Sequence, residues 1–108
     1  MDDQGTEMVS FQLVAAAGEA RSLAFEALEK AKAGDFDAAA KLMKQSKDVG
    51  IKAHHIQTQL LSNEAAGEPL SVYVLLVHAQ DHLMCSMLAQ ELVQELICLY
   101  ERTAAKNA

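Results

Sequence analysis

Hydrophobic residues recur at helical spacing along three long stretches of the chain, and two short glycine-containing breaks separate them. The first stretch covers residues 6–33 and ends at Gly34-Asp35, where glycine suits a left-handed helix end and aspartate suits a helix start. The second covers residues 36–66, and the third covers residues 69–103 after Gly67-Glu68-Pro69. The pattern therefore predicts an all-α fold, a three-helix antiparallel bundle.

The ends and faces of these helices can also be predicted. Thr6 or Ser10 is expected to cap the first helix, and Pro69 suits the first turn of the third, where its missing N–H costs nothing. Gly50 weakens the middle of the second helix by about 1 kcal/mol relative to alanine, so a kink can form there. Residues 104–108 are expected to fray. The predicted apolar stripe of the first helix consists of Phe11, Val14, Ala15, Leu23 and Leu28.

The third helix is apolar nearly all round between Val72 and Met87. A helix that is apolar on more than one face must be covered on more than one side. Two neighbours from the same chain cannot cover all of that surface. The sequence therefore predicts that the protein forms oligomers through its third helix.

Composition agrees with a single helical domain over residues 1–108. Hydrophobic residues make up 51% of the chain but aromatic residues only 5%, so the apolar content is alanine, leucine, valine and methionine, which mostly favour helices. The net charge of −6, without any basic run, argues against binding to nucleic acid, which needs clustered lysine and arginine.

The apolar runs and the cysteines indicate in which cellular compartment the protein is expected. The longest apolar run, Val72–Val77, is too short to span a bilayer, and the acidic start Met1-Asp2-Asp3-Gln4 does not resemble a signal peptide. Cys85 and Cys98 lie on one predicted helix, about 20 Å apart, too far for a disulfide. Free thiols and no export signal favour the cytoplasm, without direct membrane insertion.

The candidate chemistry lies in the octapeptide Val77-His78-Ala79-Gln80-Asp81-His82-Leu83-Met84. At about 100° per residue, His82 lies about 40° and Asp81 about 60° from His78, on opposite sides of it. Ionisable groups in apolar surroundings are costly unless they have partners or a function. Two imidazoles one turn apart can bind a metal, pass a proton or carry a phosphoryl group. Alternatively, they are core histidines that form hydrogen bonds within the bundle and have no chemical role.

This octapeptide resembles the active-site helix of enzyme IIA of the lactose/cellobiose (also chitobiose) class of the bacterial sugar phosphotransferase system. The resemblance covers nearly the whole chain. Its other parts are Glu7-Met8-Val9-Ser10-Phe11, Gly18-Glu19-Ala20-Arg21-Ser22, Gly34-Asp35-Phe36, Ala53-His54 with Gln57-Thr58, and Gly67-Glu68.

The resemblance implies a cytoplasmic phosphocarrier, which is a phosphotransferase component with a phosphohistidine intermediate. His78 takes the phosphoryl group, as tele-phosphohistidine, from the histidine protein HPr. It then passes the group to a cysteine of the cognate enzyme IIB, which serves disaccharide uptake by the membrane enzyme IIC. His82 would donate a hydrogen bond to the phosphate. Gln80, about 200° from His78, would reach the site of a neighbouring subunit instead.

The resemblance also implies a parallel homotrimer, a nine-helix bundle with the third helices nearest the axis. Asp81 then lies on the three-fold axis, where three copies bind one Mg²⁺ or another divalent cation per trimer. Alternatively, Asp81 is protonated or pairs with His82. His54 is expected to have a packing or interface role, His55 to be solvated, and Cys85 to lie in the core.

Two other functions stay open from the residues alone. The first is a metal-binding helical protein that uses His78, His82 and Asp81 as ligands. The second is a purely structural helical oligomer.

Overall fold

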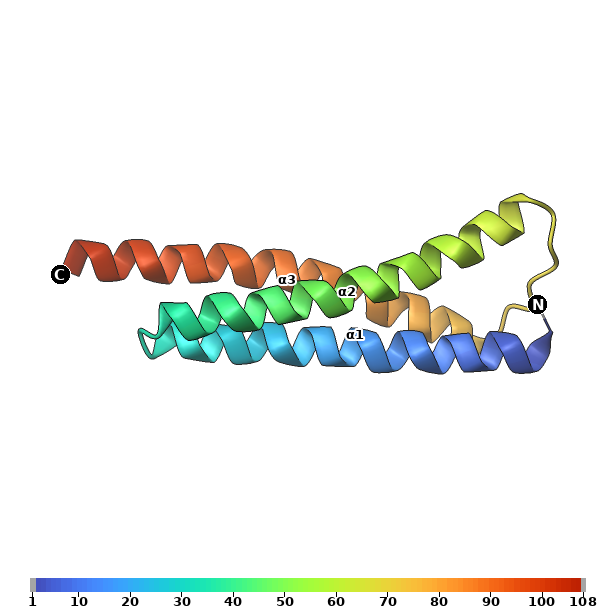
Figure 1. The fold of residues 1–108 in the computed structure, drawn as a ribbon, viewed down its shortest axis with the longest axis horizontal. Helices are drawn as coiled ribbons and strands as arrows, with labels where there is room; N and C mark the ends of the chain where they lie inside the picture. The colour runs from blue at the N-terminus through green and yellow to red at the C-terminus, as the bar shows by residue number, and fades with distance from the viewer. Residues whose placement is uncertain (1, 108) are drawn as a thin grey trace.

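The computed structural model describes residues 2–107. Three helices, α1 (Asp3–Lys32), α2 (Phe36–Ala65) and α3 (Val74–Asn107), form a rod with extents of 58 × 20 × 19 Å. They run antiparallel in sequence order (Figure 1). The predicted three-helix fold is confirmed.

Tight glycine turns end the first two helices. Gly34 has φ 83°, its N–H donates to the carbonyl of Ala31, and Asp35 N–H donates to Lys30 at 2.9 Å. This pair of bonds is a Schellman motif, which satisfies the last carbonyls of α1. The Asp35 side chain then caps α2 by accepting from Ala38 N–H at 3.1 Å, as predicted. Gly67, with φ 89°, repeats the same two bonds at the end of α2.

The start of α1 differs from the prediction. Asp2 is the N-cap, and its carboxylate accepts from Gly5 N–H at 2.7 Å. The hydroxyls of Thr6 and Ser10 instead donate to carbonyls four residues earlier, at 3.1 and 2.8 Å. Both side chains are buried, so these bonds satisfy hydroxyls that water cannot reach.

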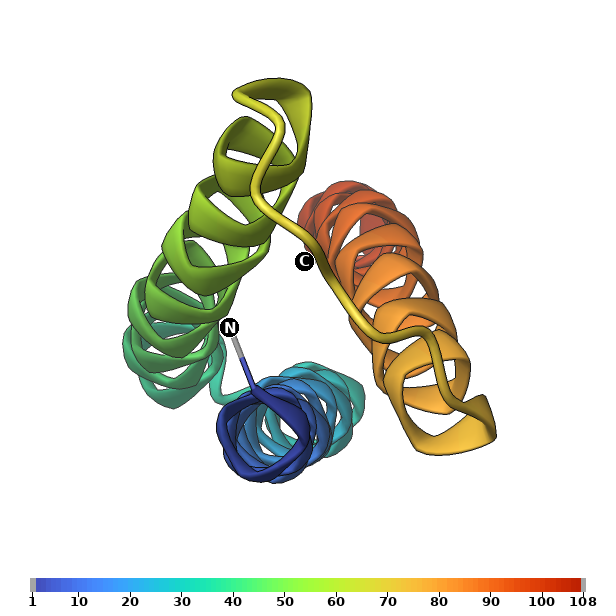
Figure 2. The ribbon, with the colours of Figure 1, turned by 90° about the vertical axis from the view of Figure 1, so that its right-hand side faces the viewer.

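The start of α3 is also later than predicted. Residues 69–73 are not helical, and α3 begins at Val74 rather than near Pro69. Figure 2 shows why: this segment crosses from the end of α2 to α3, which lies well to one side. The other end was underestimated, because α3 continues to Asn107 instead of fraying after residue 103.

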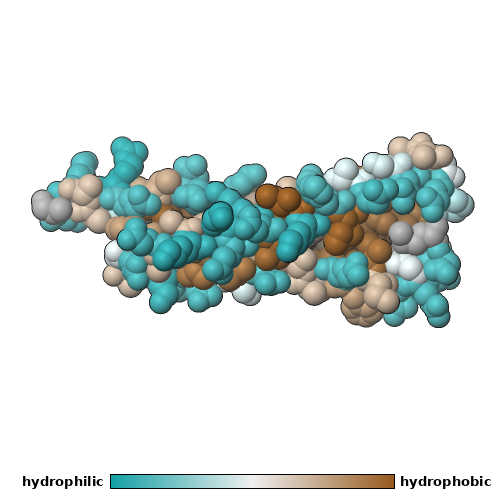
Figure 3. Space-filling model, viewed as in Figure 1, coloured by the Kyte–Doolittle hydropathy of each residue, from teal (hydrophilic) through white to brown (hydrophobic). Residues whose placement is uncertain are grey.

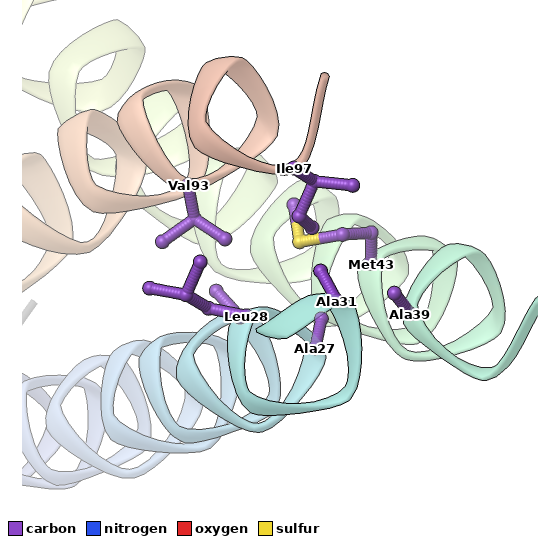
Figure 4. Packing of buried hydrophobic residues seen from close by; sticks show 8 residues of the cluster. Ala27, Leu28, Ala31, Ala39, Met43, Val93 and Ile97 are labelled. Carbon is purple, nitrogen blue, oxygen red and sulfur yellow. The ribbon is translucent and has the colours of Figure 1, made fainter. Parts of the chain in front are cut away.

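The core has two apolar clusters with small residues between helices. Figure 4 shows the first, near the α1–α2 turn, where Leu28 and Met43 meet Val93 and Ile97. The second lies toward the other end and includes Leu13, Leu60, Leu76, Ala79 and Leu83. On α1 the predicted stripe was right in part: Leu28 is buried and Val14 and Leu23 are half-buried, but Ala15 is exposed and Phe11 is 56% exposed. The buried face consists of Leu13, Ala17, Ala20, Ala24, Ala27, Leu28 and Ala31 with two hydroxyl residues.

A buried polar contact joins the three helices between these clusters. Ser46 donates to the Ala20 carbonyl at 2.5 Å, and Ser86 donates to the Ala17 carbonyl at 3.0 Å. The amide nitrogen of Gln90 donates to both the carbonyl and the hydroxyl of Ser46, each at 2.8 Å. Gly50 leaves the space that the Gln90 amide occupies.

Beyond this contact, α2 and α3 separate. The C-terminal half of α2 and the N-terminal half of α3 diverge, and the end of α2 also moves away from α1 (Figures 1 and 2). Figure 3 shows apolar surface in this opening, between α1 and α2. One whole side of α3 also stays uncovered, at positions that we call the α3 stripe: Val74, Val77, Asp81, Met84, Leu88, Leu92, Leu96 and Leu99.

Candidate functional site

His78 and His82 lie side by side on the outer surface of α3. Their ring centroids are 4.6 Å apart and the ring planes are nearly perpendicular, at 75°. His78 is exposed and His82 is half-buried, so neither is a core histidine. The i, i+4 spacing places both rings over the same patch of surface, which suits a shared small ligand. Any group bound to a ring nitrogen of His78 therefore lies beside the His82 ring.

Asp81 lies within the α3 stripe, toward its N-terminal end. It is exposed and is the one charged residue among the eight stripe positions. The thiol of Cys85 donates to its carboxylate at 3.6 Å. Cys85 is itself exposed, so the expectation that it belongs to the core was wrong.

Gln80 lies on the other flank of α3, against α2. Its carbonyl oxygen accepts a hydrogen bond from the amide nitrogen of Gln57 at 2.5 Å, and the same nitrogen lies 3.8 Å from the sulfur of Met84. Within one chain, the structure thus brings His78 and His82 together and turns Gln80 away from them. Gln57 belongs to the sequence resemblance, but no role in the site was predicted for it, because a single glutamine on a helix carries no spacing signal.

A hydrogen-bonded group at the start of α3 was also missed. Asp3 accepts from the Ser71 hydroxyl at 2.8 Å and bonds to Tyr73. The bond to Tyr73, and then that to Ser71, lowers the pKa of Asp3, while the bond to Asp3 raises the pKa of Tyr73. This group ties the beginning of α3, one turn before His78, to the beginning of α1.

A metal centre needs several ligating side chains close together. No group of three histidine, cysteine, aspartate or glutamate side chains within residues 2–107 could hold an ion. His54 and His55 are exposed on α2, and both line a shallow hollow with Gly50, Met87 and Gln90. A metal site on Asp81 would need further copies of the chain.

The family model for "PTS system, Lactose/Cellobiose specific IIA subunit" matches residues 8–101, which include the whole octapeptide. The chain belongs to the lactose/cellobiose-specific IIA family of the sugar phosphotransferase system. The family resemblance predicted from the octapeptide is confirmed, and the protein is a component of that system.

Curated members of this IIA family are similar over nearly their full length. The N,N'-diacetylchitobiose-specific EIIA component of Escherichia coli K12 is 50% identical over 92% of this chain and 85% of its own. The lichenan-specific IIA component of Bacillus subtilis is 44% identical over 89% and 87%. The lactose-specific EIIA component of Streptococcus mutans is 42% identical over 94% and 98%.

Solved structures of IIA proteins share the fold. The cellobiose-specific enzyme IIA of Bacillus anthracis superposes with a TM-score of 0.92 at 44% identity, covering 98% of this chain and 95% of its own. The chitobiose IIA protein in a complex with HPr from Escherichia coli has a TM-score of 0.81 at 47% identity, covering 92% and 96%.

Proposed function

We propose that the protein is a cytoplasmic phosphocarrier that accepts a phosphoryl group on His78 from HPr and passes it to a cysteine of enzyme IIB during disaccharide uptake. The observation that carries this proposal is the pairing of exposed His78 with half-buried His82 on the surface of α3, with ring centroids 4.6 Å apart. The similar chitobiose IIA protein forms a complex with HPr, which supports HPr as the donor.

In the proposed transfer, the Nε2 lone pair of neutral His78 attacks the phosphorus of phospho-HPr. A new N–P bond forms while the N–P bond of the donor breaks. The His78 ring releases its Nδ1 proton to solvent, and the donor imidazole takes up one proton. In the second step, a cysteine thiolate of enzyme IIB attacks the same phosphorus and forms an S–P bond while the N–P bond to His78 breaks. The leaving His78 ring takes up one proton from solvent and returns to its neutral form.

His82 supplies the hydrogen bond that this chemistry needs. An imidazole N–H beside the phosphorylated ring donates to a phosphate oxygen and holds the group in line for the next attack. Hydrogen bonds to charged groups contribute about 1.5–3 kcal/mol, which stabilises the phosphate without trapping it.

The uncovered α3 stripe supports a parallel trimer around α3. Large apolar side chains on it are 41–86% exposed in the single chain, which is costly in water and is removed when copies pack along the stripe. By length and composition, α3 is the one helix within residues 2–107 that could cross a membrane. Since the stripe contains Asp81 and is flanked by His78 and His82, packing against other copies in the cytoplasm explains its apolar character better.

This packing completes the site. Around α3, His78 and His82 lie about 60° and 100° from Asp81 on one side, and Gln80 lies about 100° from it on the other. In a cyclic assembly of parallel copies, one flank of each α3 meets the opposite flank of the next. Gln80 of one subunit therefore faces His78 and His82 of its neighbour.

Three Asp81 carboxylates near the axis would repel one another strongly in apolar surroundings. A divalent cation such as Mg²⁺, one per trimer, removes that cost, because carboxylate oxygens are ligands for hard cations. The thiol that donates to Asp81 is too weak a partner to neutralise it. In this proposal the metal stabilises the assembly and takes no part in phosphoryl transfer.

The test is phosphorylation with phosphoenolpyruvate, enzyme I and HPr. The wild type should take up one acid-labile phosphate per chain and His78→Ala none. His55→Ala, which removes an exposed histidine of α2, is the matched control and should behave as wild type. Stoichiometric phosphate on His78→Ala would overturn the proposal.

A further inference from the structure

We infer that Gln57 is a positioning residue, which orients the amide of Gln80 so that its N–H groups face the phosphate carried by the neighbouring subunit. This inference rests on the proposed function and on the trimer within it. It adds a second helix, α2, to a site otherwise formed by α3.

The contacts of Gln57 define which way both amides point. Gln57 is only 8% exposed, and its amide nitrogen donates to Gln80 Oε1 at 2.5 Å and approaches the Met84 sulfur at 3.8 Å. Because a thioether sulfur only accepts hydrogen bonds, Met84 selects the NH₂ end of Gln57 on this side. Gln80 must then present its carbonyl oxygen to α2.

The nitrogen of Gln80 consequently points outward. Within residues 2–107 the Gln80 nitrogen donates to no group, because the bond to Gln57 is made by the Gln80 oxygen. Every buried side-chain nitrogen or oxygen in these residues has a partner, so a nitrogen without one is not buried. The Gln80 nitrogen is therefore accessible, with two N–H donors available to a ligand. It lies on the flank of the α3 stripe that meets the neighbour's His78 in the proposed trimer.

The direction of this amide matters because its two ends have opposite effects on a phosphate. The NH₂ end donates to a phosphate oxygen, while the carbonyl end repels it. A free glutamine would sample both orientations. Gln57 removes the repulsive one in advance, so the site is already oriented when the phosphoryl group arrives.

Two substitutions distinguish this role from packing. Gln57→Leu removes the hydrogen-bond donor that fixes the orientation of the Gln80 amide, so that this amide can turn either end outward. Gln57→Glu reverses it, because a carboxylate accepts from the Gln80 NH₂ group and turns the carbonyl oxygen outward. Transfer from phospho-HPr, followed by rapid quench, should be fastest in the wild type, slower in Gln57→Leu and slowest in Gln57→Glu, about tenfold or more below wild type.

Gln59→Leu is the matched control. Gln59 is exposed on the same helix and bonds only to Asn63, at 2.8 Å, so its loss should leave the rate unchanged. The decisive arm repeats the Gln57 substitutions in a Gln80→Leu background, where no amide remains to orient. There, both Gln57 variants should transfer at the rate of Gln80→Leu alone.

A rate loss from Gln57→Leu that persists in the Gln80→Leu background would show a structural role and overturn the inference. So would a wild-type rate for folded Gln57→Glu. If Gln57→Glu does not fold, Gln57→Leu in the two backgrounds still decides. The amount of phosphate on His78 is measured in the same samples. If the Gln57 variants take up the normal amount of phosphate at the wild-type rate, only the inference about Gln57 is refuted. If His78→Ala takes up phosphate, the proposed function is refuted.

Discussion

Gly50→Ala and Gly18→Ala should change stability in opposite directions, although both replace a glycine inside a helix. Alanine is intrinsically better than glycine in a helix by about 1 kcal/mol. At Gly18 a new Cβ meets nothing within 4 Å, so Gly18→Ala should gain about 0.5–1 kcal/mol. At Gly50 the Cβ would lie 3.0 Å from Nε2 and 3.1 Å from Oε1 of Gln90.

The Gln90 amide cannot move away freely, because it holds two hydrogen bonds of 2.8 Å to Ser46. Each such bond contributes about 0.5–1.5 kcal/mol, and a buried group that loses its partner costs about 1–3 kcal/mol. Stretching both bonds therefore outweighs the gain in helix propensity. We expect Gly50→Ala to destabilise the protein by about 1 kcal/mol, roughly 1.5–2 kcal/mol below Gly18→Ala.

Urea unfolding of the two variants at one protein concentration measures this difference. Gln90→Ala provides the internal control, because in that background Gly50→Ala has no amide to displace and should become stabilising. Equal stabilisation by Gly50→Ala and Gly18→Ala in the wild-type background would refute the reasoning.

Three further predictions concern the site and its support. His82→Ala should still accept phosphate on His78 but transfer it roughly tenfold more slowly, as measured by rapid quench. Asp81→Leu should remove the divalent cation, abolish the effect of chelator on the melting temperature and leave a trimer by sedimentation equilibrium; dissociation into monomers would contradict this. Hydrogen bonds lower the folded-state pKa of Asp3. The Asp3 carboxylate therefore stabilises the folded protein above about pH 4, and this stabilisation is lost as pH falls through the lowered pKa. Asp3→Asn should make the free energy of unfolding, measured by urea unfolding, depend less steeply on pH in the acid range.

The positions of the helices followed from local signals in the sequence. Gly34, Asp35 and Gly67 determine where α1 and α2 end, because few other residues suit those backbone conformations or caps. The exposed side of α3 was also predictable, since one chain has too few neighbours to cover it. The i, i+4 spacing alone placed His78 beside His82.

The remaining details depend on tertiary contacts. The start of α3 at Val74 reflects the crossing segment and the bond from Ser71 to Asp3, which lie 68 residues apart. The core face of α1 was misassigned in part, because alanine and serine line it where helices approach closely, while Phe11 and Phe25 stay exposed. Hydrophobic periodicity favours large residues and therefore overlooks the small residues that line such a face.

The contact between Gln57 and Gln80 also depends on tertiary packing. The sequence gives Gln57 no distinctive spacing, and the 2.5 Å bond between the two residues arises from the way α2 packs on α3. Sequence reasoning placed Gln80 on the flank opposite His78 but could not identify what orients it.

Localising the phosphate on the chain tests the central claim most directly. Cleavage of the phosphorylated protein after Glu64 and Glu91 yields a fragment, residues 65–91, that contains His78 and His82 but neither histidine of α2. Fragmentation mass spectrometry of this peptide at alkaline pH, which preserves phosphohistidine, should place a single phosphate on His78. A phosphate on His82, on the fragment with His54 and His55, or on no histidine at all would contradict the account.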